Sequence, residues 1–412
     1  MNLAEIARVA LRGSLCAWIF ATAAVSLAYD PSLPRPSGAG APTVEGIIDP
    51  ELVWPNIIVG SPTGVPPITP AGRIDANVAT SPFAGVVSIN PNTGLPNQSF
   101  ICSGALIGTE YVITAAHCVD FTGDGGIDFT PNQIKVVFNN NNPTNNSAGA
   151  TIITASQIFV HPNWTGFNNP SINDDLVILK LSSPAPAGVP VYPLSHSTFD
   201  VAEDIVLAGY GTTGDGVTGA IAGSANFFLK RTGLNLTAAY VFDDEAPEAD
   251  YEAFLFDFDG PTAATNTLVD GLTFGNDKEV TLAGGDSGGP SFTWFDSNNN
   301  TAIDQGELTL FGVNTFGQGA GGFNLPRFGS QAGGMLVSGY LPFIQSVVPE
   351  PSSWAMLATA GVFLLSWQGR KLRRAGLCVV KRGTGTSDGL FCMQNPVRVG
   401  ASPLFQHVTR GR

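Results

Sequence analysis

The sequence has little charge. Charged residues make up 13% of its 412 residues, about half the usual share of roughly 25%. This excludes a coiled coil and a charged disordered chain, because both need frequent Lys, Glu, Asp and Arg. The 49 Gly and 30 Pro residues are frequent but not periodic, which excludes collagen. Frequent Gly, Pro and Asn with few charges predict short strands connected by many turns.

Basic residues are scarce in the body of the chain. Between Tyr29 and Glu350 there are 8 Lys and Arg against 31 Asp and Glu, and the whole chain carries −14. Nucleic acid is therefore not an expected partner, because binding a polyanion needs a basic surface. The tail from Gly369 onward is the reverse, with 9 basic residues and one acidic residue. The acidic body and the basic tail need separate explanations.

Cysteine is also rare. Of the five cysteines only Cys102 and Cys118 fall in the body of the chain. Two cysteines exclude a disulfide-dense scaffold, but they allow one bridge if the chain is exported.

The N-terminal end carries a targeting pattern. Residues 1–28 combine Arg8 and Arg12 with an apolar run and the small-residue site Ser26-Leu27-Ala28, which predicts a cleaved signal peptide. An uncleaved anchor is the alternative, but the run is shorter than the roughly 20 residues that a membrane span needs. Residues 29–73 are rich in Pro and Gly, and we interpret them as a pro-segment or linker.

The C-terminal end has a second targeting pattern. Pro349-Glu350-Pro351 is followed by an apolar stretch from Trp354 to Trp367 and by a basic cluster at 370–374. An apolar helix with a basic stop is typical of membrane association. This order resembles the PEP-CTERM sorting signal of Gram-negative bacteria. The resemblance implies a transmembrane helix within 348–374, transient membrane anchoring, an exosortase-type processing enzyme as partner, and a final location in the envelope or outside the cell. A plain single-pass anchor is the alternative, and the basic tail 375–412 is assigned no role.

Residues 74–347 form the body. Short β-runs such as 134–138 and 176–179 alternate with turn residues, and the only helix expected is Gly339 to Val347. This pattern predicts an all-β domain.

Three segments of the body carry catalytic residue types, in the order His, Asp, Ser. They are Thr114–Cys118 with His117, Asn173–Leu181 with Asp174 and Asp175, and Gly284–Pro290 with Ser287. A serine hydroxyl is a weak nucleophile unless an imidazole takes its proton and a carboxylate orients the imidazole. It also needs N–H donors aimed at the oxygen that becomes negative.

Together these segments resemble the chymotrypsin/trypsin-like (S1 family) serine proteases. The resemblance implies two six-stranded antiparallel β-barrels, with the active site in the cleft between them and a short C-terminal helix. It makes His117 the general base, Ser287 the nucleophile and Asp175 the orienting carboxylate, with Asp174 as the alternative. The amides of Gly285 and Ser287 would form the oxyanion hole, and a Cys102–Cys118 disulfide would hold the histidine loop.

The same resemblance suggests a substrate pocket and an activation step. Thr281 takes the place of the pocket base, where a trypsin-type Arg or Lys preference needs a carboxylate, so a small or medium apolar substrate residue is expected. The remaining pocket residues would be Thr315, Phe316 and Gly317. A new N-terminal amine would pair with Asp286. Cleavage at Arg73–Ile74 is the first candidate, and the segment Asn56–Gly60 is the alternative.

Two polar loops suggest structural calcium. The first has oxygen-bearing side chains at EF-hand spacing, which Ca²⁺ can use as ligands; they are Asp296, Asn298, Asn300, Asp304 and Glu307. The second is shorter, with Asp120, Asp124 and Asp128. Polar surface turns are the alternative for both. No cofactor is expected for catalysis itself.

These patterns predict a monomeric, exported bacterial serine endopeptidase that acts on proteins or peptides. The alternative from another class is an inactive protease homologue that serves as a calcium-binding envelope or matrix protein. A regulatory protease that cleaves a single partner is a further alternative.

Overall fold

The computed structural model describes residues 58–59, 70–94, 99–166, 174–197, 204–242, 251–268, 273–275, 278–318 and 326–349. The predicted signal peptide, most of the pro-segment, the sorting signal and the basic tail lie outside the described residues. Within the described ranges, no helix has the length and apolar character needed to cross a membrane.

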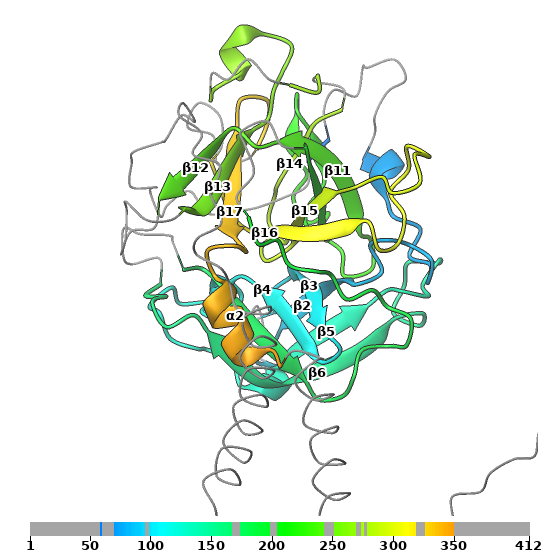
Figure 1. Cartoon of the computed structure of the whole chain (residues 1–412), viewed down its shortest axis with the longest axis vertical. Coiled ribbons are helices and arrows are strands. Elements are labelled where there is room, and N and C mark those ends of the chain that lie inside the picture. Colours follow the sequence, from blue (N-terminus) through cyan, green and yellow to red (C-terminus); the bar gives the residue numbers. More distant parts are fainter. Residues whose placement is uncertain are drawn as a thin grey trace, which may run out of the picture. The chain divides into compact units, whose positions relative to one another are not determined.

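The first half of the body is a closed barrel, drawn in cyan and green-blue in Figure 1. Five of its six strands are short and largely buried, as expected for β-branched runs bounded by turns, whereas β6 (Thr151–Val160) has ten residues and is mostly exposed or half-buried. Around the barrel they follow the order β2-β3-β4-β7-β6-β5. They are β2 (Val86–Pro91), β3 (Cys102–Gly108), β4 (Tyr111–Thr114), β5 (Ile134–Phe138), β6 (Thr151–Val160) and β7 (Val177–Leu181).

The second half is a seven-stranded antiparallel sheet with the order β11-β8-β15-β16-β17-β13-β12. Its strands are β8 (Asp204–Gly209), β11 (Arg231–Leu236), β12 (Ala239–Phe242), β13 (Tyr251–Asp257), β15 (Pro290–Trp294), β16 (Leu308–Gln318) and β17 (Gln331–Leu336). The all-β prediction is confirmed, although this sheet has one strand more than the six expected. Strand β13 is buried along almost its whole length and pairs on both edges, with β17 and with β12, so the β12–β13 hairpin extends the sheet.

A smaller sheet brings a distant segment to the second half. It has the order β10-β9-β1-β14. Its strands are β1 (Ile58–Val59), β9 (Gly214–Asp215), β10 (Gly219–Ala220) and β14 (Val280–Thr281). Strand β1 comes from the predicted pro-segment, and it pairs antiparallel with β14, with Ile58 opposite Thr281 and Val59 opposite Val280. The pro-segment therefore reaches the strand that leads to the Ser287 motif.

One hydrophobic cluster joins the two halves. Val86 and Ile113 of the first barrel share it with Phe292 and Val313 of the second sheet, and all four side chains are buried. A shared core of this kind fixes the two halves against each other, because burial of apolar surface is the main favourable term in folding. Residues at the facing ends of the two halves can then form one site.

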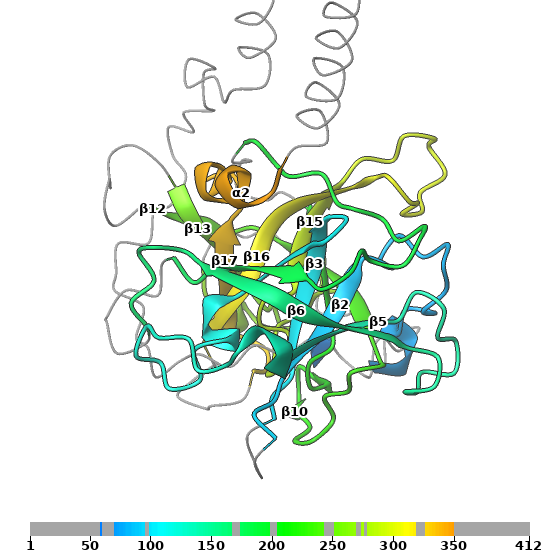
Figure 2. The ribbon, with the colours of Figure 1, turned by 90° about the horizontal axis from the view of Figure 1, so that it is seen from below.

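The last element of the body is the helix α2 (Leu341–Val347), which confirms the helix expected at 339–347 to within two residues. Leu341 and Ile344 pack into the shared core. Figure 1 shows α2 beside β4, and in Figure 2 it lies near β17, the strand that precedes it. The helix thus returns the chain from the second sheet to the first barrel.

Candidate active site

His117 and Asp175 meet at one end of the first barrel. Strands β4 and β7 are antiparallel neighbours with Thr114 opposite Val177, so the residues after β4 and before β7 lie at the same edge. His117 lies in the short 3₁₀ helix η3 (Ala116–Cys118), which follows β4. Asp175 Oδ1 accepts a hydrogen bond from the His117 backbone N–H at 2.9 Å, and Asp175 Oδ2 lies 2.6 Å from His117 Nδ1.

The environment of this pair suits a general base. The Asp175 side chain is 1% exposed, whereas the His117 side chain is 13% exposed. A buried carboxylate against Nδ1 orients the ring and keeps the proton on Nδ1, which makes Nε2 the atom that accepts a proton. The tautomer follows from this contact rather than from an observed hydrogen.

Asp174, the alternative carboxylate, faces a different histidine. Its Oδ1 lies 2.8 Å from His161 Nδ1. Asp174 has a φ of 66°, a left-handed backbone conformation that costs a non-glycine residue about 1–3 kcal/mol and needs support from its surroundings. The structure therefore brings Asp175, and not Asp174, to His117. The sequence predicted only a structural role for His161, because Val160–Trp164 resembles the family's strand before the aspartate loop.

Ser287 lies in a tight turn just before β15. The following residue, Gly288, has a φ of 76°, and a Cβ at this position would lie 1.8 Å from Thr114 Oγ1 and 2.7 Å from the backbone nitrogen of Ala115. Only glycine permits this approach. The turn that carries Ser287 is thereby packed directly on the segment that leads to His117.

Ser103 of β3 forms hydrogen bonds with the turn that carries Ser287. Its N–H donates to the carbonyl oxygen of Ser287 at 2.7 Å. Its hydroxyl donates to the carbonyl oxygen of Gly285 at 2.8 Å and accepts from the N–H of Tyr210 at 3.0 Å. Sequence analysis missed Ser103, because a serine inside a strand carries no motif. These bonds set the orientation of the peptide groups that would supply the oxyanion donors.

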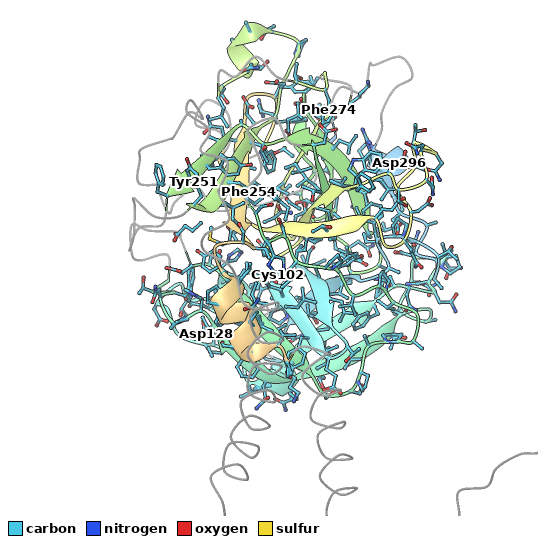
Figure 3. All side chains as sticks on the ribbon, in the orientation of Figure 1. Cys102, Asp128, Tyr251, Phe254, Phe274 and Asp296 are labelled. Carbon is cyan, nitrogen blue, oxygen red and sulfur yellow. A yellow bond between two sulfur atoms is a disulfide. The ribbon has the colours of Figure 1, made fainter. Side chains whose placement is uncertain are left out.

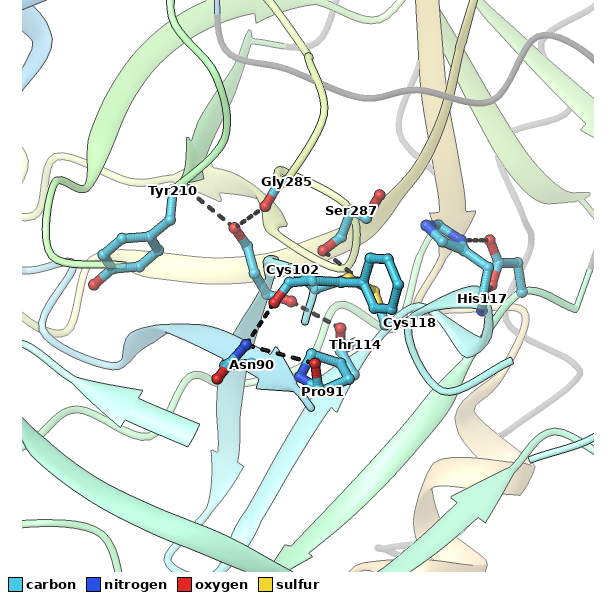
Figure 4. Close-up of a disulfide and its surroundings, with 12 residues drawn as sticks. Asn90, Pro91, Cys102, Thr114, His117, Cys118, Tyr210, Gly285 and Ser287 are labelled. Atoms are coloured by element: carbon cyan, nitrogen blue, oxygen red, sulfur yellow. Dashed lines mark hydrogen bonds and ion pairs between the residues drawn. A yellow bond between two sulfur atoms is a disulfide. The ribbon is translucent and has the colours of Figure 1, made fainter. Parts of the chain in front are cut away.

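The Cys102–Cys118 disulfide is present, which confirms that prediction. It joins β3 to η3, and Cys118 Sγ lies 3.8 Å from the carbonyl oxygen of Ser287. Figure 4 shows His117, Ser287 and the disulfide gathered in one place. The bridge spans a sequence separation of 16 residues, and on the chain-entropy model a loop of this size contributes about 3 kcal/mol. It ties the histidine segment to the strand that also holds the serine turn.

The Asp286 carboxylate is buried behind the serine turn. Oδ1 accepts from the Gly211 N–H at 2.8 Å, and Oδ2 accepts from the Ala283 N–H at 3.2 Å. Burial lowers the pKa of Arg231, and the charge of Asp286 partly offsets that shift. A Cβ on Gly211 would lie 2.6 Å from Asp286 Oδ2, which explains the glycine after Tyr210.

The predicted pocket residues lie on two strands. They are Thr281 at the end of β14 and Thr315, Phe316 and Gly317 in β16. Thr281 is fully buried, and β16 carries a bulge between Asn314 and Phe316, so Thr315 is the extra residue of the bulge. Whether these residues receive a substrate side chain stays a prediction.

The first predicted calcium loop connects β15 and β16. Figure 3 shows Asp296 apart from Cys102. Asp296 accepts from the N–H groups of Thr301 at 2.8 Å and Asn300 at 3.1 Å. These bonds, that of Thr301 above all, lower the pKa of Asp296 and keep it ionised. The Asp304 carboxylate accepts from the side-chain amide of Asn300 at 2.7 Å, and the pKa of Glu307 is lowered, chiefly by the Ser297 hydroxyl. Calcium binding here stays a prediction.

The second predicted calcium loop is organised around Asp120. Its buried carboxylate accepts four hydrogen bonds, from the N–H groups of Gly123, Asp124 and Gly125 and from Trp164 Nε1. Donors on both oxygens leave the carboxylate satisfied without a cation. Asp124 and Asp128 accept from the backbone of the same loop. These contacts do not support calcium at Asp120, which instead anchors the loop that follows Cys118.

No acidic metal cluster stands out in the described part of the chain. The single group of three or more His, Cys, Asp or Glu ligand atoms within 4.8 Å of one another consists of Cys102, His117 and Cys118. Its two sulfur atoms are joined in the disulfide, so this group is not a ligand set.

Comparison with known proteins agrees with this geometry. The family model described as Trypsin matches residues 72–222. Trypsin of Sus scrofa is 29% identical over 128 residues, which are 31% of this chain and 49% of that protein. Vitamin K-dependent protein C of Rattus norvegicus is 24% identical over 253 residues, 61% of this chain and 47% of that protein. Chymotrypsin-like elastase family member 1 of Macaca fascicularis is 33% identical over 81 residues, 20% of this chain and 27% of that protein. The chain spans about half or less of the length of these curated relatives. The matches support a trypsin-like serine protease domain in the chain.

Proposed function

We propose that the trypsin-like domain of this chain is an active serine endopeptidase. The observation that carries the proposal is the buried contact of 2.6 Å between His117 Nδ1 and Asp175 Oδ2, beside a glycine-bounded turn that presents Ser287. A histidine that only packs in the core, or a glycine turn that only reverses the chain, would not explain why the His117–Asp175 pair and the Ser287 turn occur together.

The proposed reaction proceeds in two halves. Ser287 Oγ attacks the carbonyl carbon of the scissile peptide bond while His117 Nε2 takes the hydroxyl proton, and Asp175 stabilises the resulting imidazolium. The amides of Gly285 and Ser287 would stabilise the oxyanion. The proton then passes from His117 to the amide nitrogen as the C–N bond breaks. The amine departs, and the acyl group stays on Ser287 as an acyl-enzyme. Water, activated by His117 in the same way, releases the acid and restores Ser287.

We propose that the enzyme has no strong preference for Arg or Lys before the scissile bond. A buried substrate cation needs a carboxylate partner, and Thr281 supplies none. The neighbouring Glu279 carboxylate is engaged with the N–H groups of Asp259 and Phe274 and the hydroxyl of Thr273, and burial raises its pKa. A peptide library digested by the processed protein should show small or medium apolar residues at this position. Enrichment of Arg or Lys would overturn the proposed preference.

The proposed activation step is cleavage in the segment before the catalytic domain. The first candidate, Arg73–Ile74, is held against β11. Ile74 forms a β-bridge with Arg231, and Asp75 Oδ2 lies 3.0 Å from the fully buried Nζ of Lys230. Burial lowers the pKa of Lys230, and Asp75 opposes that shift. Breaking a buried ion pair costs about 3–5 kcal/mol. A new N-terminus at Ile74 would therefore pay a high free-energy cost to move from β11 to Asp286.

The alternative segment has better support. Ile58 pairs with Thr281, five residues before Asp286, and Val59 pairs with Asp215 of β9. We propose cleavage after Asn56, which gives an Ile57 amine to pair with Asp286. N-terminal sequencing of processed, active protein should start at Ile57. Arg73→Gln should be processed normally. A mature chain that starts at Ile74, or an Arg73→Gln variant that is never activated, would contradict this assignment.

Export and sorting complete the proposal. We propose that the signal peptide and the PEP-CTERM-like segment direct the protein to the bacterial envelope or medium, with an exosortase-type enzyme as processing partner and transient anchoring by the apolar helix. The active form is proposed to be monomeric and to act on protein or peptide substrates. Calcium in the Asp296–Glu307 loop would be structural and not catalytic.

The competing hypothesis is an inactive homologue that binds calcium in the envelope or matrix. In this hypothesis the chain has the fold of a trypsin-like protease but does not hydrolyse peptides. Hydrolysis of peptides by the processed wild type, with loss in a Ser287 variant, separates the two hypotheses.

A further inference from the structure

A second histidine–carboxylate pair lies next to the proposed triad. His161 Nδ1 is 2.8 Å from Asp174 Oδ1, and both side chains are largely buried. The two atoms lie within contact distance, although His161 Nδ1 does not meet the geometry of a hydrogen bond. Asp174 and Asp175 are consecutive, and their carboxylates reach two different histidines.

The backbone at Asp174 needs support, and the pair is part of that support. Asp174 has a φ of 66°, and its N–H donates to the Tyr340 hydroxyl at 2.9 Å. The Leu176 N–H donates to the carbonyl oxygen of Asp174 at 2.6 Å. These bonds hold the peptide groups on both sides of Asp175. The direction of the Asp175 side chain therefore depends on how Asp174 is held.

His161 is itself fixed on three sides. Its backbone N–H donates to the carbonyl oxygen of Leu176 at 2.9 Å. Its ring meets Tyr340 and Phe343 edge-on, with ring centroids 5.0 Å apart in both cases. His161 is the first residue after β6, and its contacts with Leu176, Tyr340 and Phe343 make it a rigid partner for Asp174.

We propose that His161 and Asp174 are positioning residues for the catalytic aspartate. The inference rests on the proposed function in that it assigns the pair a part in the same reaction. His161 holds Asp174, Asp174 fixes the turn into β7, and the turn delivers Asp175 to His117. Neither residue touches the substrate or the reacting atoms.

The charges around the pair give the proposal a pH signature. Among the described residues, the titratable groups that face His161 are Asp174 and Tyr340. Asp174 is followed in the chain by Asp175, which contacts His117. Strands β6 and β17 and helix α2 carry no charged residue. Lys180 of β7 lies over the ring of Tyr111. Two neighbouring carboxylates repel when both are ionised, so removing the charge of Asp174 changes the field at Asp175 and His117.

The test compares His161→Phe, Asp174→Asn and Tyr340→Phe in the processed protein. We expect His161→Phe to lower kcat between about 10-fold and 100-fold with little change in KM, because a small displacement of a catalytic group has effects of this size. Tyr340→Phe removes the hydroxyl acceptor but no charge, so it should lower kcat without moving the pH profile. Asp174→Asn should move the acid limb of kcat/KM to lower pH, because negative charge near His117 favours its protonated form.

A second readout does not require turnover. The proton between His117 Nδ1 and Asp175 lies in a short contact of 2.6 Å, and such protons resonate far downfield in the NMR spectrum. His161→Phe should shift this resonance upfield and speed its exchange with water, while Asp174→Asn should do so less. An unchanged resonance with unchanged kcat in His161→Phe would overturn the proposal. If the wild type shows the resonance but no hydrolysis, the proposed function fails, and the resonance alone still decides whether His161 positions Asp175.

Discussion

Replacing Ser287 by alanine is expected to lower kcat for peptide hydrolysis about a millionfold, the scale on which loss of a triad nucleophile acts. The reason is that Ser287 is the one hydroxyl residue in the segment Gly284–Pro290, so its loss leaves this turn without a nucleophile. Steady-state kinetics on an unselective peptide substrate measures the loss. KM should stay near the wild-type value, because the pocket strands are untouched.

Ser183→Ala is the matched control for this substitution. Ser183 is exposed and lies in the turn after β7, so its loss should leave kcat within about twofold, in line with surface substitutions that change stability by less than about 0.5 kcal/mol. A Ser287→Ala protein that keeps more than a few per cent of the wild-type rate would show that another residue performs the chemistry.

Asp175→Asn is expected to lower kcat about 10⁴-fold near neutral pH. The side-chain amide of the introduced asparagine could turn an N–H toward His117, and the ring would then hold its proton on Nε2, where it cannot accept the serine proton. The variant should recover part of its rate at high pH, where hydroxide assists the reaction. A pH–rate profile measures both effects.

Asp174→Asn is the comparison variant here, because the two carboxylates are consecutive. It should lower kcat by less than about 100-fold, because Asp174 positions its neighbour but does not itself contact His117. Equal losses in Asp174→Asn and Asp175→Asn would contradict the assignment of Asp175 as the carboxylate that orients His117.

Local sequence patterns were sufficient for much of the fold. The runs at Tyr111–Thr114 and Ile134–Phe138 are strands with those bounds, because β-branched and aromatic residues between turn signals favour short strands whatever surrounds them. The last helix follows equally local signals, with Pro342 in its first turn. Ser287 stands in a motif whose glycines allow close packing, since Gly288 lies against Thr114 and Ala115.

Long-range pairing could not be predicted from these patterns. Local chemistry does not separate Asp174 from Asp175, because both positions carry the same carboxylate. The family resemblance selected Asp175, and the structure places this residue at His117. Strand β1 comes from a Pro-rich segment, and its partner in β14 is more than 200 residues away. Ser103 was missed for the same reason, because its hydroxyl acts on Gly285 across a distance of 182 residues in the sequence.

Labelling by a fluorophosphonate probe tests the central claim most directly, because the probe reacts only with a serine activated by a neighbouring base. Processed wild-type protein should form one covalent adduct, which mass spectrometry of the digested protein places on Ser287. His117→Ala should abolish the adduct, and Ser183→Ala should leave it unchanged. Failure of the processed wild type to form an adduct at Ser287, or an adduct that persists in His117→Ala, would contradict a catalytic triad of His117, Asp175 and Ser287.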